Sequence, residues 1–452
     1  MISFENINKF DPLYQFLNNY FRWAHNHLYY KKIQIIGYEN MPPKGYPIFA
    51  ISNHQNGLMD PLAMLYLYKD HRQPVFIARG DIFKKSDFVA KLLRFLKILP
   101  TFRTRDGGRD DVKSNLATFD LAARILNEGG TLTMFPEAGH QAGKFFSTFK
   151  KGFPRVAFRA AEISNYQLDF KILPMYIYYT NYFSIRNEQV VVIGQPFAID
   201  EFYELYQSEP NKAYAAMNEK AREAVRSMGV DVTDHEHYVQ YDMIFTVCRS
   251  AVVKREGWNP KEPYSSLKSD KLLVEQVDAQ RQDHPEQFEK LMAMATEYRE
   301  GLSQLKLRDW LFDQPSLGKA VALKSLRLAL TAPLALFGLI HNFIPFRACE
   351  LLKRKSTDPM FKSSLNFAVS AIVTFPIAYI SLFILVCCLA NWWVALLYLA
   401  AAFLTLPCYY GWKIGFIKLM GMCRFRKLSK AGNAQLKKLA ELREEIRKML
   451  VK

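Results

Sequence analysis

The amino-acid sequence predicts an α/β domain with a central, mostly buried sheet, followed by a helical insert and C-terminal transmembrane helices. Between residues 33 and 197, strand-like apolar runs alternate with helix-like runs, which is typical of a sheet covered by helices. Residues 200–318 are polar and show mainly helical periodicity. Residues 363–412 contain no charged side chain. A stretch of that length accommodates two spanning helices of about 20 residues each and a turn.

Composition narrows the class of partner. The chain has 452 residues, enough for two or three domains, and a formal net charge of +17. This basic excess points to an anionic partner, either nucleic acid or a membrane surface. Nothing in the sequence resembles a nucleic-acid-binding module, and the uncharged C-terminal stretch favours anionic membrane lipid. The six cysteines lack zinc spacing and are interpreted as reduced, and the first residues lack the pattern of a secretory signal.

Residues 1–32 are predicted to form an amphipathic, aromatic-rich helix. Apolar side chains recur there at helical spacing, as at Leu13, Phe16, Leu17 and Tyr20. Such a helix either lies at a membrane interface or covers the edge of the sheet. The sequence leaves both alternatives open.

The α/β domain is assigned to residues 33–199. Its expected strands occupy 46–52, 75–78, 131–135, 172–179 and 190–193. The clearest helix covers 112–126 and ends at Gly129 and Gly130. The largely apolar strands indicate a sheet that is covered on both faces.

Residues 200–318 are interpreted as a helical insert packed on the α/β domain, with helices over 211–228 and 268–305. Within the insert, the acidic and histidine residues at 234–237 resemble metal ligands. Their spacing differs from that of HExxH sites, and Asp234 also suits the start of a helix. No metal site is therefore assigned.

A membrane region is assigned to residues 319–427. It contains a spanning hairpin over 363–412 that turns at 391–393, where two Trp residues suit the membrane interface. The shorter segment 328–346 either spans or is re-entrant or interfacial. Basic residues flank it on both sides, which favours the second alternative. Residues 428–452 are predicted to form an amphipathic helix that lies on anionic lipid or pairs with another helix.

The segment 53–60 contains the most informative chemistry in the chain. His54 and Asp60 lie on an expected strand-to-helix turn, and a His–Asp pair can act as a general base and its orienting carboxylate. The alternative is structural: Asp60 before Pro61 is also a common helix start, and His54 is then an ordinary loop histidine.

Three later segments, taken together with His54 and Asp60, form a recognisable series of sequence motifs. They are the residues 98–106, the run Phe135-Pro136-Glu137-Ala138-Gly139 and the residues 172–175. Together with His54 and Asp60, they resemble the four blocks of the glycerolipid acyltransferase superfamily, over roughly residues 29–197. The resemblance implies a PlsC-like α/β acyltransferase domain.

The resemblance is closest in architecture to the yeast-type glycerol-3-phosphate acyltransferases. In those enzymes, as here, five residues separate the His from the Asp, and a long membrane-bound half follows. One departure concerns the third block, where Ala138 stands in place of the usual Gly and Gly139 follows. This change could shift the local backbone by one residue.

The resemblance implies roles for the remaining site residues. Arg103 and Arg105 would bind the phosphate of the acceptor, unless they form a solvated edge. Glu137 would accept hydrogen bonds from the acceptor hydroxyls, unless it begins the next helix. Gly139 would allow close backbone approach, and Pro174 would shape the side of the acyl donor.

The implied reaction is acylation of glycerol 3-phosphate by an acyl thioester to give lysophosphatidate, with His54 as general base. The donor would be acyl-CoA or acyl carrier protein, with no cofactor and no metal. Alternatives are acylation of 1-acylglycerol 3-phosphate, or a non-catalytic membrane scaffold. The chain would be an integral membrane protein whose catalytic domain faces the cytoplasm. Its oligomeric state is not indicated.

Overall fold

The computed structural model of the chain describes residues 3–102, 109–140, 143–314, 316–354 and 361–451. It divides into two compact units. The first comprises Met1–Thr233, Glu262–Leu267 and Asp358–Ser364, and the second comprises Asp234–Lys261, Lys268–Thr357 and Leu365–Lys452. Arg103 and Arg105 lie outside the described residues.

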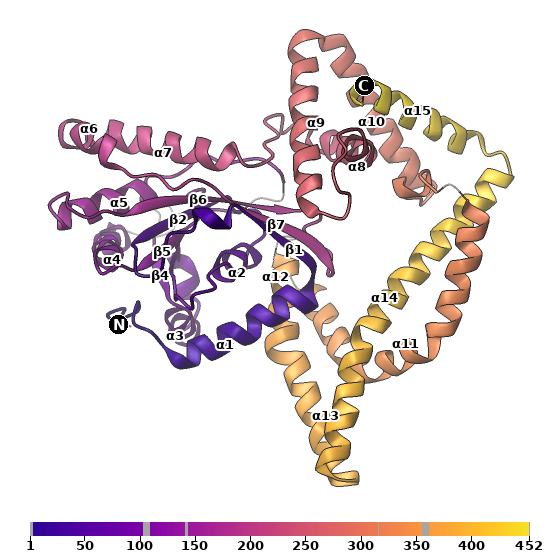
Figure 1. The fold of residues 1–452 in the computed structure, drawn as a ribbon, viewed down its shortest axis with the longest axis horizontal. Helices are drawn as coiled ribbons and strands as arrows, with labels where there is room; N and C mark the ends of the chain where they lie inside the picture. The colour runs from indigo at the N-terminus through magenta and orange to yellow at the C-terminus, as the bar shows by residue number, and fades with distance from the viewer. Residues whose placement is uncertain (1–2, 103–108, 141–142, 315, 355–360, 452) are drawn as a thin grey trace. The chain divides into compact units, whose positions relative to one another are not determined.

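The first unit is built on a mixed sheet, confirming the predicted α/β class (Figure 1). Its strands are β1 (Tyr30–Ile36), β2 (Ile48–Ser52), β3 (Val75–Arg79), β4 (Ile98–Thr101), β5 (Thr131–Met134), β6 (Lys171–Tyr179) and β7 (Asn187–Ile193). In the described part of the chain, the sheet order is β1-β7-β6-β2-β5-β3-β4. Strands β6 and β7 are antiparallel, and the other neighbouring pairs are parallel.

Strand β1 was not predicted. It lies at one edge of the sheet, paired with β7 alone, and its Lys31 and Lys32 are exposed. An edge strand with lysines lacks the continuous apolar run that identifies a buried strand, which explains why the sequence pattern did not reveal it.

Helices accompany the sheet in the first unit. They are α1 (Pro12–Trp23), η1 (Ala24–Tyr29), η2 (Tyr38–Asn40), α2 (Met59–Leu65), η3 (Gly80–Lys84), α3 (Asp87–Phe95), α4 (Arg109–Asn127), α5 (Gly152–Ile163), η4 (Asp200–Phe202), α6 (Tyr203–Ser208) and α7 (Pro210–Arg226). The start of the insert was predicted at residue 200, but α6 and α7 belong to the first unit. The reason is a stripe of buried residues on α7, Ala213, Met217, Ala221 and Val225, and α7 packs on β6 and α5.

Helix α1 packs on the described part of the domain through one face. Tyr14 is buried and forms an edge contact with Phe95 of α3, with ring centroids 6.1 Å apart. On the same helix, Leu13 and Phe16 are 60% and 69% exposed. The helix therefore covers part of the sheet unit and also presents an uncovered apolar face.

The second unit is helical. Its elements are α8 (Tyr238–Arg255), most of α9 (Pro263–Asp283), α10 (Pro285–Gln304), η5 (Asp309–Leu311), α11 (Leu317–Arg354), the second half of α12 (Phe361–Ala368), η6 (Val369–Thr374), α13 (Phe375–Leu389), α14 (Trp392–Lys430) and α15 (Ala434–Leu450). The single helix predicted over 268–305 is instead two helices. The break lies at His284, which has φ −140°, because a proline at position 285 disfavours helical backbone in the residue before it.

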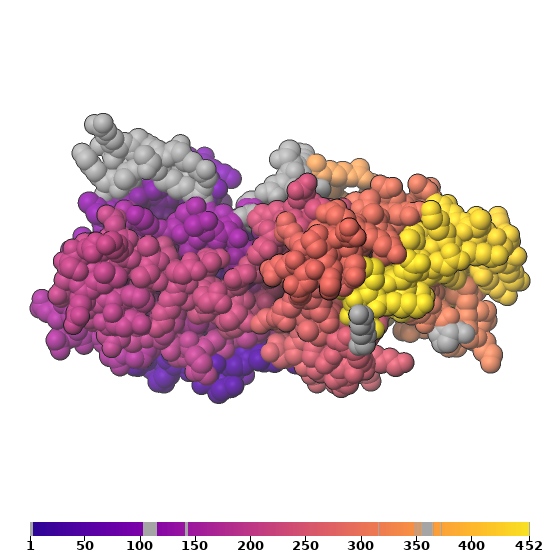
Figure 2. Space-filling view, turned by 90° about the horizontal axis from the view of Figure 1, so that it is seen from above, coloured from indigo at the N-terminus to yellow at the C-terminus, as the bar shows by residue number. Residues whose placement is uncertain are grey.

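Helix α15 pairs with other helices, which resolves one predicted alternative. It packs on α8 and α10 of the same unit, and Figure 2 shows this C-terminal segment, in yellow, against the orange-red helices. Arg443 of α15 is buried and binds the carboxylates of Asp309 and Asp313 at 2.7 Å and 2.6 Å. Leu439 of α15 lies so close to Gly301 of α10 that a side chain at position 301 would collide with the Leu439 side chain.

Among the described residues, three helical segments of the second unit are long and apolar enough to cross a membrane: Leu317–Ala348, Asn366–Leu389 and Trp392–Lys430. Helices α11 and α14 pack together, and the indole N–H of Trp412 donates to the carbonyl of Leu328 at 2.9 Å. The predicted turn near 391 is present, because Asn391 caps α14 by accepting the backbone N–H of Val394.

Candidate active site

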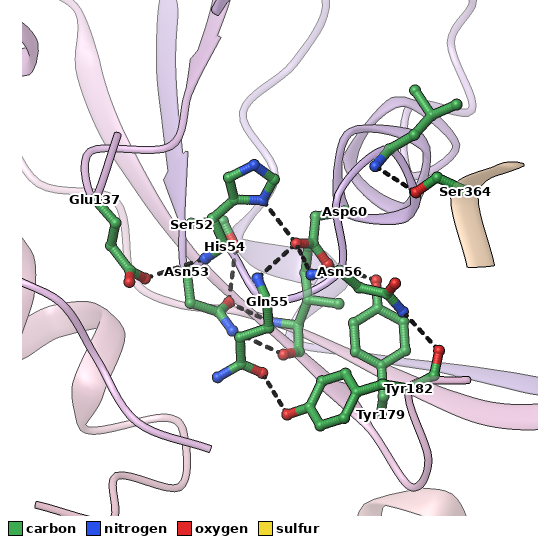
Figure 3. Close-up of polar contacts among 12 residues, drawn as sticks. Ser52, Asn53, His54, Gln55, Asn56, Asp60, Glu137, Tyr179, Tyr182 and Ser364 are labelled. Carbon is green, nitrogen blue, oxygen red and sulfur yellow. Dashed lines mark hydrogen bonds and ion pairs between the residues drawn. The ribbon is translucent and has the colours of Figure 1, made fainter. Parts of the chain in front are cut away.

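The candidate site lies where three neighbouring strands end. Strands β5, β2 and β6 are adjacent and parallel, so their carboxyl ends meet at one edge of the sheet. His54 follows β2, Glu137 follows β5, and Tyr179 is the last residue of β6. Figure 3 shows these side chains together with Asp60 at the start of α2. Ligands of open α/β sheets bind at this kind of edge.

The central contact joins the predicted pair. His54 Nδ1 lies 2.8 Å from Asp60 Oδ2 (Figure 3). The His54 side chain is 16% exposed, and that of Asp60 is fully buried. A hydrogen bond from Nδ1–H to the carboxylate fixes the neutral ring in the tautomer that has its lone pair on Nε2. The arrangement can take a proton at Nε2 and stabilise the resulting imidazolium.

The five-residue spacer closes around the carboxylate. The backbone N–H groups of Gln55 and Asn56 both donate to Asp60 Oδ2 at 2.7 Å. Gly57 has φ +45°, a conformation that glycine adopts easily, and it lets the loop turn before α2 begins. Leu58, not Asp60, occupies the N-cap position of α2, so the alternative that Asp60 caps this helix is wrong.

Further contacts anchor the loop at both ends. Asn53 is buried and clamps Ile177 of β6: its Nδ2 donates to the carbonyl at 2.9 Å and its Oδ1 accepts the N–H at 2.8 Å. At the other end, the backbone N–H of Leu58 donates to Ser364 Oγ at 2.8 Å (Figure 3). Ser364 belongs to α12 but groups with the first unit. The loop is therefore held from the sheet and from a distant segment of the chain.

The imidazole ring of His54 contacts two other rings. His54 stacks on Phe135 with centroids 4.3 Å apart, and His140 lies edge-on to it at 5.5 Å. Phe135 follows β5, so the stacking fixes the ring relative to the neighbouring strand. A ring restrained at Nδ1 and on one face retains little freedom to reorient.

Glu137 connects the backbone of two loops. Its Oε1 accepts the N–H of His54 at 3.1 Å, and its Oε2 accepts the N–H of Ser147 at 3.0 Å. Burial raises the pKa of this carboxyl to about 7, and the negative charge of Asp60 adds to that rise, while the two backbone hydrogen bonds oppose it. The alternative that Glu137 begins the next helix is wrong, because α5 begins at Gly152.

The other predicted residues are placed less directly. Ala138 has φ +55°, so it adopts the left-handed backbone that glycine favours, and the backbone has not shifted to Gly139. A side chain at Gly139 would meet open space. Pro174 lies inside β6 opposite Ile51, deeper in the sheet than the strand ends that carry His54 and Tyr179. The predicted phosphate ligands at positions 103 and 105 fall outside the described residues.

The acidic and histidine residues at 234–237 form a local contact in the second unit. Asp234 accepts hydrogen bonds from the backbone and the ring of His237, and its carboxylate lies 3.3 Å from Arg281. Among the described residues, no group of three or more His, Cys, Asp or Glu side chains is arranged to hold a metal ion.

Sequence reasoning missed several residues that hold the site. The hydroxyl of Tyr179 donates to Asp60 Oδ1 at 2.6 Å, that of Tyr182 donates to Gln55, and Asn53 clamps Ile177. The two tyrosines follow the loop by more than a hundred residues, and only the pairing of β6 with β2 brings them close. An Asn directly before the histidine, at the end of an apolar run, was the local signal that the sequence offered.

These features define a class of protein. Residues 32–178 match the family model described as Acyltransferase, and this segment contains His54, Asp60 and Glu137. The segment is an acyltransferase domain of the glycerolipid acyltransferase superfamily, as the four sequence blocks predicted.

Particular relatives are similar to the same part of the chain. The "1-acyl-sn-glycerol-3-phosphate acyltransferase" of Borreliella burgdorferi is 28% identical over 34% of this chain and 55% of its own length. A protein of the same description from Chlamydomonas reinhardtii is 29% identical over 32% and 40%. The matches thus span about half or less of each relative. The crystal structure of the acyltransferase PlsC from Thermotoga maritima is similar at 18% identity, with a TM-score of 0.33, over 48% of this chain and 81% of that one.

Proposed function

We propose that this chain is a membrane-bound O-acyltransferase of phospholipid biosynthesis that acylates 1-acylglycerol 3-phosphate to give phosphatidate. The observation that carries the proposal is the 2.8 Å contact between His54 and the buried carboxylate of Asp60, at the carboxyl edge of the sheet in an acyltransferase domain. The acyl donor is a thioester of CoA or of acyl carrier protein. No cofactor is required, because the acceptor hydroxyl is itself the nucleophile.

In this proposal, His54 Nε2 removes the proton of the acceptor hydroxyl as its oxygen attacks the thioester carbonyl. Asp60 stabilises the imidazolium that forms. The tetrahedral intermediate then collapses, the C–S bond breaks, and the imidazolium returns its proton to the departing thiolate. The products are an ester and a free thiol, and His54 is again neutral.

The choice of acceptor depends on the relatives. Both curated relatives described above are named for 1-acyl-sn-glycerol 3-phosphate, and this supports the acylated acceptor over glycerol 3-phosphate. Glycerol 3-phosphate is the second candidate, favoured by the five-residue spacer and the long membrane region. In either case, Arg103 and Arg105 would bind the acceptor phosphate, because guanidinium groups match it with paired hydrogen bonds.

Glu137 has a positioning role in this proposal. Both of its oxygens accept backbone N–H groups and only 4% of the residue is exposed, which favours holding the His54 backbone over binding acceptor hydroxyls. The apolar helices and the +17 charge support attachment to anionic membranes with the catalytic unit on the cytoplasmic side.

The test incubates purified full-length protein, in anionic lipid vesicles, with labelled acyl-CoA and either 1-acylglycerol 3-phosphate or glycerol 3-phosphate. Mass spectrometry identifies the lipid formed, and the His54→Ala protein is the control. Labelled phosphatidate from the first acceptor supports the proposal. Product from glycerol 3-phosphate alone would favour the second candidate. No product with either acceptor, or with acyl carrier protein as donor, would favour a scaffold.

A further inference from the structure

Asp60 is held on one oxygen by its own loop. Its Oδ2 accepts the ring N–H of His54 at 2.8 Å and the backbone N–H groups of Gln55 and Asn56 at 2.7 Å. Three donors restrain this oxygen, but a carboxylate anchored at one atom can still swing about it. The orientation of the His54 ring therefore depends on what holds the other oxygen.

The other oxygen is held by the sheet. Oδ1 accepts the hydroxyl of Tyr179 at 2.6 Å, a length typical of a charge-assisted hydrogen bond (Figure 3). Tyr179 ends β6, which pairs with β2 on one side and β7 on the other. The position of this hydroxyl is thus set by the sheet and does not follow movements of the 53–58 loop.

Tyr179 remains a donor throughout the pH range in which histidines exchange protons. The residue is fully buried, and burial together with the charge of Asp60 raises the pKa of its hydroxyl well above the usual value. The hydrogen bond to Oδ1 is therefore a permanent feature of the folded site.

We propose that Tyr179 is a positioning residue for acyl transfer, whose hydroxyl fixes the plane of the Asp60 carboxylate and through it the orientation of His54. The inference rests on the proposed function, since it assigns Tyr179 a role in that reaction. Tyr179 acts on His54 through Asp60. Without its hydroxyl, Asp60 turns, and the His54 ring spends less time with Nε2 available to the acceptor.

Tyr179→Phe tests the proposal, because it removes the hydroxyl and keeps the ring. The expected result is a fall in kcat of about 10- to 100-fold, with KM for donor and acceptor unchanged. Tyr176→Phe is the matched control. Tyr176 is also fully buried on β6, but its hydroxyl contacts the backbone of Val230. This control should keep the wild-type kcat.

A second measurement does not depend on turnover. In protein labelled with ¹⁵N at its histidine rings, NMR reports the tautomer of His54, assigned by comparison with His54→Ala. Wild type and Tyr176→Phe should show the Nδ1–H form, and Tyr179→Phe a mixture of both tautomers. If wild type transferred no acyl group but Tyr179→Phe changed the His54 tautomer as expected, the proposed function would be contradicted and the positioning of His54 by Tyr179 would be supported. A Tyr179→Phe tautomer identical to that of Tyr176→Phe would overturn the inference, whatever kcat does.

Discussion

The carboxylate of Glu137 bridges the backbone N–H groups of His54 and Ser147, at 3.1 Å and 3.0 Å. It joins the end of β5 to the residue that follows β2 on the neighbouring strand. Because burial raises the pKa of Glu137 to about 7, against the opposing effect of these two hydrogen bonds, the stability of the domain should depend on pH.

The pH prediction follows from the direction of that shift. In the unfolded chain Glu137 titrates near its ordinary value of 4.5, and in the folded chain near 7. The folded state therefore binds more protons between these values, so the contribution of Glu137 is fully present below pH 4.5 and is lost as the pH rises to 7. The loss amounts to about 3 kcal/mol. Because Gln does not titrate, the unfolding free energy of wild type should fall relative to that of Glu137→Gln as the pH rises from 4.5 to 7. A difference between the two proteins that stays constant over this range would contradict the prediction.

The backbone at position 138 offers a second test. Ala138 has φ +55°, which costs an L-residue about 1–2 kcal/mol, part of which glycine recovers. Ala138→Gly should therefore raise the unfolding free energy by about 0.5–1 kcal/mol. The control is Gly139→Ala, which meets open space and should change stability by less than about 0.5 kcal/mol. A destabilised Ala138→Gly protein would show that the left-handed backbone carries no strain.

The Asn53 clamp should be essential for stability. Asn53→Ala leaves the N–H and C=O of Ile177 without their partner inside the domain, at a cost of about 3 kcal/mol. Chemical denaturation measures the effect. Asn211→Ala, at an exposed site on α7, is the control and should stay within about 0.5 kcal/mol of wild type. Equal effects of the two substitutions would show that the clamp contributes little.

The catalytic pair gives the most direct prediction. His54→Ala should lower acyl transfer by about 10²–10⁴-fold without unfolding the protein, and Asp60→Asn should be nearly as severe. The exposed His27 supplies the control, because His27→Ala leaves the site untouched. Rates are measured with labelled acyl-CoA, and circular dichroism checks the fold. Substantial activity of folded His54→Ala protein would refute the general-base role.

The sequence pattern within a single segment was enough to predict those elements and contacts that form within that segment. The strands that flank His54 and Glu137 are apolar runs with clear ends, and the His54–Asp60 pair lies within one turn. The partners of that pair could not be predicted in the same way. Tyr179 meets Asp60 only because β6 and β2 pair, a contact across 119 positions that the hydropathy of neither strand specifies.

Helix α11 shows a different limit of hydropathy. Its composition suits a membrane span, yet contacts near both of its ends restrict it. Asp313, just before α11, binds Arg443 of α15 within the second unit. Ser364, beyond its end, accepts the N–H of Leu58 within the first unit. Among the described residues, no candidate span lies between Leu58 and Asp313, so we expect these two residues to lie on the same side of a membrane.

If Asp313 and Ser364 lie on the same side, the chain between them crosses the membrane an even number of times. Among the described residues, α11 is the one candidate span between them, so it cannot cross. We expect α11 to be embedded without crossing, consistent with the basic residues at both of its ends. The remaining two candidates, Asn366–Leu389 and Trp392–Lys430, then form the spanning hairpin, since Arg443 returns to the starting side.

Membrane-impermeant labelling of single cysteines tests this topology, in a chain whose native cysteines are replaced. Probes at Glu350, near the end of α11, and at Glu441 on α15 should react from the side of the catalytic unit, and a probe at Asn391 from the opposite side. The expectation follows from the two contacts above, because each joins the chain before and after an apolar segment. A Glu350 probe that reacts from the Asn391 side would mean that α11 crosses, and the contact between Leu58 and Ser364 could not then form in the membrane.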